Sequence, residues 1–470
     1  MNPHPIPRWT RRAALARVAL GFGGLAAATL LASSPARAGQ AEPASPLAPR
    51  PPRFRPRARR VIFLFMHGGP SHVDTFDYKP LLVRDSGKPL PFAKPRVQFA
   101  QTGNLRRSPW NFRQHGDCGL WVSELFPNVG ACADDLCVLK AVHGTNEAHG
   151  GALLKLHTGS ESQVRPSMGA WVSYGLGTEN ANLPSFITIN PTLGHGGVAN
   201  WSNAFLPAVH QGTRIGGGVP VDQATIANLT PALQRPVQRA QLDLLADLQR
   251  EHLGLAGPDP ALAARIESFE LAFRMQSEAP DILSLHGETE ATRRLYGLDN
   301  PRTASFARQC LLARRFSERG VRFVQVTHGY WDQHSDLTRD HARLASEVDQ
   351  PIAALLRDLR GRGLLDDTLV LWGGEFGRTP TVQGADGRDH HPHAFTMWMA
   401  GGGVRPGHSH GATDDYGFYP AHGGVHVHDL HATLLALLGI DHEHLTFHHA
   451  GRDFRLTDVA GEVVHDILRT

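Results

Sequence analysis

The sequence is poor in several features that would each indicate a particular class of protein. Its 47 basic and 44 acidic side chains leave a net charge of only +3 in 470 residues. No overall field therefore attracts nucleic acid or a lipid surface, and we expect no nucleic-acid partner. Cysteine is scarce, and its spacing matches no zinc module. In an oxidising compartment the cysteines could form one or two disulfides, with the pairing left open; they are Cys118, Cys132, Cys137 and Cys310.

Two common enzyme motifs are also missing. The run Gly401-Gly402-Gly403 lacks the Lys and Ser/Thr of a phosphate-binding P-loop and is better interpreted as a turn at a strand end. No G-x-S-x-G segment is present to support a serine hydrolase. The uncharged apolar stretch at residues 18–32 is too short to span a bilayer comfortably.

The amino-terminal region predicts export. Arg11 and Arg12 directly precede the mild apolar stretch, which is typical of a twin-arginine signal. Ala36-Arg37-Ala38 has the small-x-small pattern of a signal-peptidase site, so we expect cleavage near Ala38. The mature protein would then be periplasmic or otherwise exported, with no stable membrane span; an ordinary Sec signal or an uncleaved anchor is the alternative. We assign residues 1–38 to the signal, 39–60 to a Pro- and Arg-rich linker, and 61–470 to a single domain with insertions.

Strand and helix patterns alternate along this domain. Short apolar runs predict strands at 61–66, 186–189, 321–326, 368–372 and 395–399. Helical patterns cover 151–156, much of 231–320, 341–360 and 430–438. Residues 81–124 are interpreted as an insertion, and 194–220 as a long surface loop that could shape a substrate entrance. The alternation predicts an α/β fold with a mostly parallel central sheet.

Histidine is abundant, and its distribution points to metal binding. Of the 28 histidines, 17 lie between His328 and the C-terminus. Most acidic and histidine clusters directly follow predicted strands, and Asp389 and His390 come just before the strand at 395–399. The carboxyl ends of such strands form the ligand crevice of open α/β sheets. The resulting candidate ligands are His72, Asp74, Asp332, His334, Glu375, Asp389 and His390.

This mixed set of donors suits one or two divalent ions. Imidazole and carboxylate together favour Zn, Mn or Fe, with Ca kept as a further candidate. For any single cluster, a merely solvated loop histidine is the alternative. Four clusters beside four strands favour a metal centre.

Several segments together resemble a known family. They are MHGGPSHVDTFDYKP, YWDQH, GGEFGRTP, GRDHHPHAFTMWMAGGGV and VHVHDLHATLLALLGIDH. These segments, spread over residues 61–468, resemble the exported domain-of-unknown-function family 1501, which is grouped with the alkaline phosphatase and sulfatase superfamily. The resemblance implies a three-layer α/β/α sandwich with one or two metals. It also implies that one ligand is missing, because Phe376 stands where that superfamily usually has a histidine.

The resemblance further implies a catalytic role for two residues. The segment HGGALLKLHTG resembles the sulfatase helix that begins with the nucleophile, and His149 occupies that position. Histidine can attack phosphorus, and Arg378 would help to hold the anion. The implied function is a metal-dependent hydrolase of phosphate or sulfate esters acting on an anionic ester or glycan. A catalytically silent binding or scaffold protein for glycans or an exported partner is the alternative, and the oligomeric state is left open.

Overall fold

A computed structural model describes residues 45–93, 101–231, 233–257 and 259–469. The predicted export signal at 1–38 lies outside the described residues. Within the described part of the chain, no helix is both long and apolar enough to cross a membrane.

The described residues form a central sheet of nine strands. Its order is β12-β4-β11-β8-β1-β7-β5-β6, and β15 also pairs with β4. Only β11 runs antiparallel to its neighbours, β4 and β8, so the predicted α/β fold with a mostly parallel sheet is confirmed. The strands are β1 (Arg60–Met66), β4 (Leu136–His143), β5 (Phe186–Ile189), β6 (Thr213–Ile215), β7 (Phe323–His328), β8 (Thr368–Gly373), β11 (Phe395–Ala400), β12 (His408–His410) and β15 (Val425–His426).

Strand β1 lies in the middle of the sheet and contributes to both halves of the core. Its register pairs Val61 with Phe323 of β7 and with Leu369 of β8. Successive side chains of a strand point to opposite faces: Ile62 and Leu64 join one apolar cluster, and Val61 and Phe63 join the other. All seven residues of β1 are buried, because helices cover both faces of the sheet.

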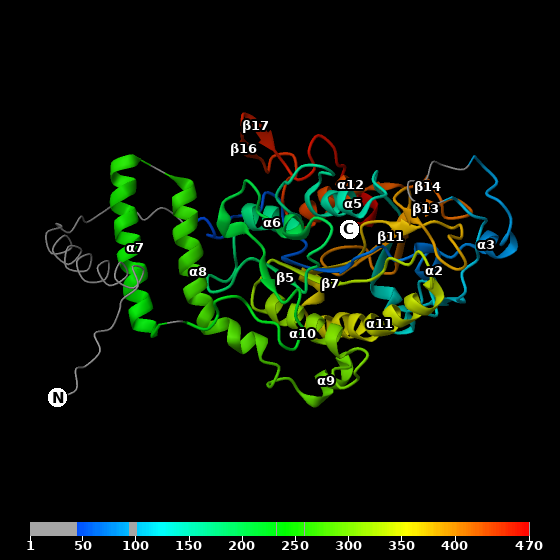
Figure 1. Cartoon of the computed structure of the whole chain (residues 1–470), viewed down its shortest axis with the longest axis horizontal. Coiled ribbons are helices and arrows are strands. Elements are labelled where there is room, and N and C mark those ends of the chain that lie inside the picture. The colour runs from blue at the N-terminus through cyan, green and yellow to red at the C-terminus, as the bar shows by residue number, and fades with distance from the viewer. Residues whose placement is uncertain (1–44, 94–100, 232, 258, 470) are drawn as a thin grey trace, which may run out of the picture. The chain divides into compact units, whose positions relative to one another are not determined.

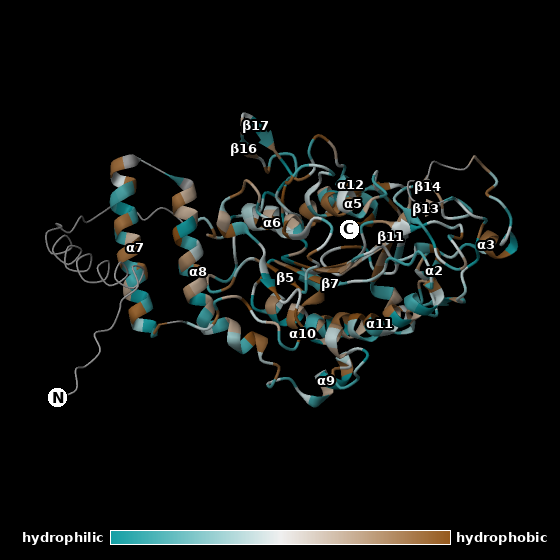
Figure 2. Ribbon diagram, viewed as in Figure 1, coloured by the Kyte–Doolittle hydropathy of each residue, from teal (hydrophilic) through white to brown (hydrophobic). Residues whose placement is uncertain are grey.

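Two groups of helices complete three layers. Figure 1 shows α10 (Ala304–Glu318) and α11 (Leu337–Gly361) on one face of the sheet. On the other face lie α5 (His149–Thr158), α6 (Met168–Leu176) and α12 (Val427–Leu437). Figure 2 shows hydrophobic colouring concentrated in the strands between them. Burial of each large apolar side chain in these layers contributes roughly 1.5–3 kcal/mol before entropic costs.

Residues 231–320, predicted to be mainly helical, contain three further helices. They are α7 (Arg235–Ala256), α8 (Pro260–Leu283) and α9 (Glu290–Tyr296). Asp259 caps α8 by accepting from the main-chain N–H of Ala261 and Leu262. An ion pair of 2.5 Å between Arg239 and Glu270 joins α7 to α8, and the two helices lie side by side (Figure 1).

The proline- and arginine-rich leader packs against the domain over its described part. The main-chain N–H of Arg53 donates to Gly439 O and that of Arg57 to Leu437 O, each at 2.8 Å. Ala58 is fully buried. These contacts place residues 45–59, part of the segment assigned from the sequence to a Pro- and Arg-rich linker, on the body of the domain.

The insertion and the cysteines complete the outline. Residues 81–124 hold most of α3 (Pro80–Arg84) and the hairpin of β2 (Phe112–His115) with β3 (Leu120–Ser123). All four cysteines are free thiols, and only Cys118 is exposed. Burial raises the pKa of Cys137 to about 12. The one or two disulfides that the sequence analysis allowed are therefore not formed.

Candidate metal centre

The antiparallel direction of β11 brings the predicted polar segments to one edge of the sheet. Its amino end lies beside the carboxyl end of β8, at the same edge of the sheet as the carboxyl ends of β1 and β7. Asp332 and His334 follow β7, Glu375 follows β8, and His390 precedes β11 in the short strand β10 (His390–His391). The structure therefore brings together side chains that lie up to 58 positions apart in sequence.

Three potential ligand atoms face one another at the site, one each from Asp332, His334 and His390. Oδ1 of Asp332 lies 3.0 Å from Nε2 of His334 and 3.0 Å from Nε2 of His390. The two Nε2 atoms are also 3.0 Å apart. The three atoms form a nearly equilateral triangle.

Hydrogen bonds on the far side of each ring fix which nitrogen carries the proton. Nδ1 of His390 lies 2.6 Å from the main-chain O of Glu147, and a carbonyl only accepts, so Nδ1 donates. Nδ1 of His334 donates in the same way to Oε1 of Gln383 at 2.6 Å. In the neutral rings both Nε2 atoms are then bare lone pairs. Two bare nitrogens and a carboxylate oxygen repel one another unless a cation or an added proton lies between them, and the hydrogen bond to Asp332 raises the pKa of His334.

This set of donors fits a divalent ion. Ligand bonds of 2.0–2.2 Å in tetrahedral geometry place neighbouring ligand atoms about 3.3–3.5 Å apart, close to the spacing of this triangle. Oδ1 of Asp389 lies 3.7 Å from Nδ1 of His334. Asp389, His334 and His390 form one grouping of potential ligands within 4.8 Å, and His149, Asp332 and His390 form another. Imidazole and carboxylate donors together suit Zn, Mn or Fe.

His149, the first residue of α5, lies between two carboxylates. Its Nδ1 is 2.7 Å from Oε1 of Glu375, and its Nε2 is 3.1 Å from Oδ2 of Asp332. Burial opposes a charged ring, but the hydrogen bonds to Asp332 and Glu375 raise the pKa of His149 to about 9. Burial also opposes the Glu375 carboxylate, yet the bond from His149 lowers the pKa of Glu375 to about 2. Glu375 therefore orients the His149 ring so that Nε2 faces Asp332.

Arg378 supports Asp332 from behind. Its Nη2 donates to Oδ1 of Asp332 at 2.7 Å. Burial opposes the Asp332 charge, but the hydrogen bond from His149 and the charge of Arg378 hold the pKa of that carboxyl well below its usual range.

The guanidinium of Arg378 is closed to a ligand. It is fully buried, and its remaining N–H groups donate to protein carbonyls, among them Gly69 O at 3.0 Å and Trp331 O at 3.1 Å. The role expected from the sequence, holding a substrate anion, does not fit this geometry. Arg378 instead positions Asp332.

A glycine pair lets the end of β1 approach the centre. Gly68 and Gly69 have φ of 115° and 86°, which side chains rarely tolerate. A Cβ on Gly68 would lie 2.8 Å from the main chain of Asp332, and one on Gly69 would lie 2.6 Å from the Phe376 ring. The N–H of Gly68 donates to both carboxylate oxygens of Glu375, at 3.0 and 3.1 Å. The absence of a side chain at both positions therefore allows the segments after β1, β7 and β8 to pack closely at the site.

Two of the predicted ligands lie outside the cluster. The Asp74 carboxylate is buried in an ion pair with Arg388, with Nε to Oδ2 at 2.7 Å, and also accepts from Ser71 at 2.5 Å. Nε2 of His72 lies 2.8 Å from Gly417 O, so it donates there. Both residues belong to the short helix α2 (His72–Thr75), and neither is among the potential metal-binding groups of the described residues.

Phe376 has an apolar role where the resemblance implied a missing ligand. Its ring stacks on His390, with centroids 4.5 Å apart, and lies 4.9 Å from the His149 ring. It therefore helps to fix both imidazoles by packing.

Two histidines at the site were not predicted from the sequence. His67, directly after β1, and His195, in the loop after β5, form a group of potential ligands with His149. The rings of His149 and His195 stack 4.8 Å apart. Nε2 of His67 is buried and has no hydrogen-bond partner among the described residues. The position of His67 at a strand end could have indicated it, whereas His195 lies six residues beyond β5 in a glycine-rich loop with no such signal.

The cluster opens into two adjoining pockets. One, of about 490 Å³, is lined by His67, His149, His195 and Asp332 together with Asn190 and Tyr330. The other, of about 480 Å³, is lined by His149, His195, His334 and His390. The first is lined by three non-glycine residues with positive φ, namely Asn190 (53°), His195 (46°) and Tyr330 (73°). Such strained conformations concentrate at functional sites.

Comparison with known proteins identifies the family and several similar folds. The family described as "Protein of unknown function (DUF1501)" matches residues 58–468. Among curated proteins no relative matches the chain. The chain is similar to the PsFucS1 sulfatase from Pseudoalteromonas sp. (13% identity, 82% of this chain and 68% of that chain, TM-score 0.35).

Two further solved structures are similar at the same level. One is the lipoteichoic acid synthase LtaP from Listeria monocytogenes (11% identity, 85% of this chain and 74% of that chain, TM-score 0.31). The other is a protein in the alkaline phosphatase superfamily from Vibrio parahaemolyticus (10% identity, 85% and 72%, TM-score 0.34). The geometry of the site, and not these similarities, supports the functional proposal.

Proposed function

We propose that this chain, which belongs to the DUF1501 family, is a metal-dependent hydrolase of phosphate or sulfate esters. The observation that carries the proposal is the triangle of Asp332 Oδ1, His334 Nε2 and His390 Nε2 with edges of 3.0 Å. With both Nδ1 atoms held as donors to Glu147 O and Gln383, these three atoms can offer lone pairs to a cation. The two pockets of about 490 and 480 Å³ adjoin these atoms, and we assign the ester to them.

Asp332, His334 and His390 would hold the ion, with Asp389 and His149 close enough to contribute. A divalent ion bound there supplies Lewis-acid stabilisation of charge on an ester oxygen. Zn, Mn and Fe match these donors better than Mg.

The residues of the chain itself would then bind and orient the ester. His149 is held by Glu375 with Nε2 directed toward the centre, in the arrangement of an oriented general acid, which becomes a base or nucleophile once Nε2 gives up its proton. His67 and His195 line the same pocket and can donate N–H groups to the anionic oxygens. Arg378 keeps Asp332 ionised and fixed.

Metal analysis combined with a substrate panel tests this proposal. Purified protein should contain a first-row divalent ion at a ratio near one or two, and Asp332→Asn should abolish both this content and the turnover of phosphomonoester, phosphodiester or sulfate substrates. A loaded, intact site that turns over none of these substrates would favour the silent binding protein instead. Absence of any specifically bound ion would contradict the metal centre itself.

We also propose that the chain is exported, on the support of Arg11, Arg12 and the Ala36–Ala38 site. Expression of the full chain should give a periplasmic product whose first residue lies near Gly39. Replacement of both arginines by lysine should leave the precursor in the cytoplasm, and unchanged export of that variant would contradict a twin-arginine route.

A further inference from the structure

The pocket of about 490 Å³ at His149 combines a polar part with an apolar part. The polar part carries potential metal ligands, and the apolar part is formed by Pro191, Leu193 and Tyr330. Leu193 is 53% exposed and Tyr330 is 81% exposed. Large side chains of this kind, left in water beside a polar site, mark a surface that a ligand covers.

Two neighbouring strands bring Leu193 and Tyr330 to the same pocket. β5 and β7 run parallel, and their register pairs Ile189 with Val326. Leu193 and Tyr330 each follow these paired residues by four positions. Cδ1 of Leu193 lies 3.8 Å from the position that a Cβ on Gly218 would take, and Gly218 lines the pocket as well. One ligand group in this pocket can therefore contact the loops after both strands.

The backbone of Tyr330 is strained and is held in place by its neighbours. Its φ of 73° lies in the left-handed region, which a residue with a Cβ rarely adopts. The N–H of Trp331 donates to His67 O at 3.1 Å, and the side-chain amide of Gln333 donates to Tyr330 O. Trp331 is fully buried. Conformations that the surrounding structure fixes in this way cluster at ligand sites.

The charges of the lining indicate a substrate with one anionic group. In the described part of the chain, no lysine or arginine lines either pocket at His149. The guanidinium of Arg378 is enclosed by protein carbonyls, and His149 is already paired with Asp332 and Glu375. The centre can balance the reacting ester, but a second sulfate, phosphate or carboxylate group would lie in these pockets without a counter-charge.

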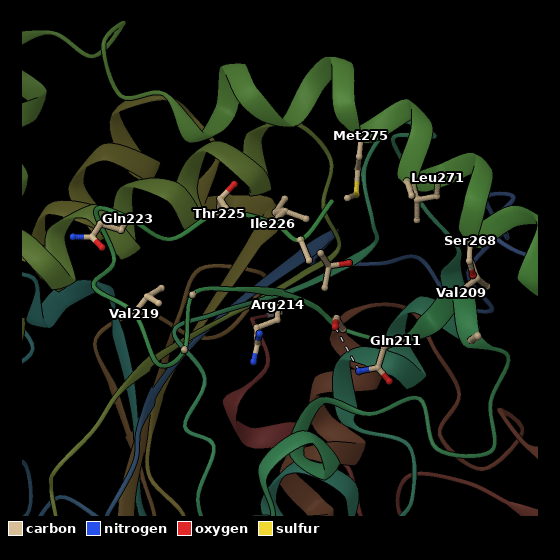
Figure 3. A pocket seen from close by; sticks show the side chains of 17 residues that line it. Val209, Gln211, Arg214, Val219, Gln223, Thr225, Ile226, Ser268, Leu271 and Met275 are labelled. Atoms are coloured by element: carbon tan, nitrogen blue, oxygen red, sulfur yellow. Dashed lines mark hydrogen bonds between the residues drawn. The ribbon is translucent and has the colours of Figure 1, made fainter. Parts of the chain in front are cut away.

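Another pocket, of about 550 Å³, does not extend this site toward further anionic groups. Residues between 208 and 227 and helix α8 form it, and none of its lining residues lines the pockets at His149. Among the described residues, Arg214 is the one charged side chain of its lining. Figure 3 shows Arg214 directed away from Ile226, Leu271 and Met275. This pocket therefore gives no support for a long, multiply charged substrate.

We propose that the alcohol part of the ester is an uncharged apolar ring, which contacts Leu193 and Tyr330 while the single anionic group lies at the metal centre. This inference rests on the proposed function and narrows its substrate to monoesters of phenols or uncharged cyclic alcohols. The ring of Tyr330 offers a face for stacking. Leu193 and Pro191 offer aliphatic contacts to the same ring.

Non-hydrolysable analogues test this proposal without turnover. They are the phosphonates and sulfonates of three groups: methyl, which has no ring; benzyl, which has an uncharged ring; and 4-carboxybenzyl, whose ring carries a second anion. Calorimetry measures their binding to the metal-loaded full chain. Turnover of methyl, phenyl and 4-carboxyphenyl phosphates and sulfates is measured in parallel.

Four variants separate the ring contact from a general effect on the surface. Tyr330→Ala removes the ring, Tyr330→Phe keeps it, and Leu193→Lys adds a cation to the pocket. Leu255→Lys is the matched control, because Leu255 is 85% exposed and lines none of the pockets described above. Far-UV circular dichroism checks that each variant is folded.

Wild type should bind the benzyl ligand at least ~10-fold more tightly than the methyl and carboxybenzyl ligands. Tyr330→Phe and Leu255→Lys should keep this preference for benzyl over methyl, and Tyr330→Ala should lose it. Leu193→Lys should favour carboxybenzyl over benzyl, because the added cation pairs with the second anion.

Three results would overturn the inference. They are equal binding of benzyl and carboxybenzyl ligands by wild type, an unchanged preference in Tyr330→Ala, and loaded protein that binds none of the ligands. If benzyl binding depends on Tyr330 but no ester is turned over, the hydrolase proposal fails and the ring site stands. If methyl, phenyl and carboxyphenyl esters are turned over equally well, the hydrolase proposal stands and this inference fails.

Discussion

Nε2 of His334 faces Nε2 of His390 across 3.0 Å, and the Nδ1 atom of each ring is committed to an acceptor. Neither neutral ring has a proton to place between them. A bound cation would relieve the repulsion between these two nitrogens.

Metal removal should therefore destabilise the protein. At an ion concentration 100 times Kd, binding to the folded state alone adds about 2.7 kcal/mol to the free energy of unfolding. Chelation should lower Tm, readdition of Zn or Mn should restore it, and His390→Gln should reduce affinity at least ~10-fold. Calorimetry with and without chelator measures this, with exposed His286→Gln as the control. An identical Tm in both conditions would contradict the centre.

Replacement by asparagine should affect stability at Asp74 and metal binding at Asp332. Asp74→Asn leaves fully buried Arg388 without its counter-charge, which should cost about 3–5 kcal/mol of stability, while metal content stays unchanged. Asp332→Asn should remove the metal. Urea unfolding and metal analysis of both variants separate the roles. Loss of metal in Asp74→Asn at full stability would restore Asp74 as a ligand.

Glu375 should act through His149. Glu375→Gln keeps the shape but cannot hold the His149 ring as strongly, so we expect activity or metal affinity to fall by about 10–100-fold. The pKa of His149, raised to about 9 with Glu375 as one partner, should fall, which NMR titration of the ring would measure. Exposed Glu462→Gln serves as the control. An unshifted His149 titration would exclude this positioning role.

Acid should destabilise the fold through buried neutral histidines. Burial lowers the pKa of His210, His341 and His431 to about 3, whereas in the unfolded chain histidine titrates near about 6.5. Between these values the unfolded state binds more protons, so stability is complete above pH ~6.5 and falls as the pH drops toward 3. At pH 5 each of these three histidines should lower the free energy of unfolding by roughly 1–2 kcal/mol.

Urea unfolding at pH 5 and pH 7 measures this loss. His431→Gln should be less stable at pH 7 but should lose less on acidification than wild type does. His286→Gln, at an exposed position, should keep the full pH dependence. If the His431→Gln variant lost as much stability between pH 7 and pH 5 as wild type does, protonation of His431 would not contribute to acid destabilisation.

Substitutions at Tyr330, which lines the pocket at His149, should measure the backbone strain at that position. Its side chain is 81% exposed, and its φ of 73° costs a residue with a Cβ about 1–2 kcal/mol. Tyr330→Gly should therefore be about 1 kcal/mol more stable than Tyr330→Ala, the reverse of the order at an ordinary position. Thermal unfolding of the pair provides the measurement, and greater stability of the alanine variant would remove the strain argument.

The sequence predicted the elements whose signals are local. The apolar run at 61–66 marked β1, and the strands at 186–189, 368–372 and 395–399 lie within one residue of their observed ends. Strand β4 was not predicted, because the polar Lys140 interrupts its apolar pattern. Three segments that carry histidine or acidic residues could be expected at the site: those after β7, after β8 and before β11. The carboxyl ends of parallel strands lie at the same edge of a sheet, and ligands bind along that edge.

The sequence by itself determined the α/β alternation, the mostly parallel sheet, and the segments that carry Asp332, His334, Glu375 and His390, since hydrophobic periodicity and strand-end position are local properties. Only the tertiary structure decided which carboxylates are available. It pairs Asp74 with buried Arg388, encloses Arg378 among carbonyls, and brings His67 and His195 to His149. The physical reason is that a side chain can bind a metal ion only through a lone pair that is not already used in another interaction. Whether such a lone pair is available depends on neighbours that are distant in the chain.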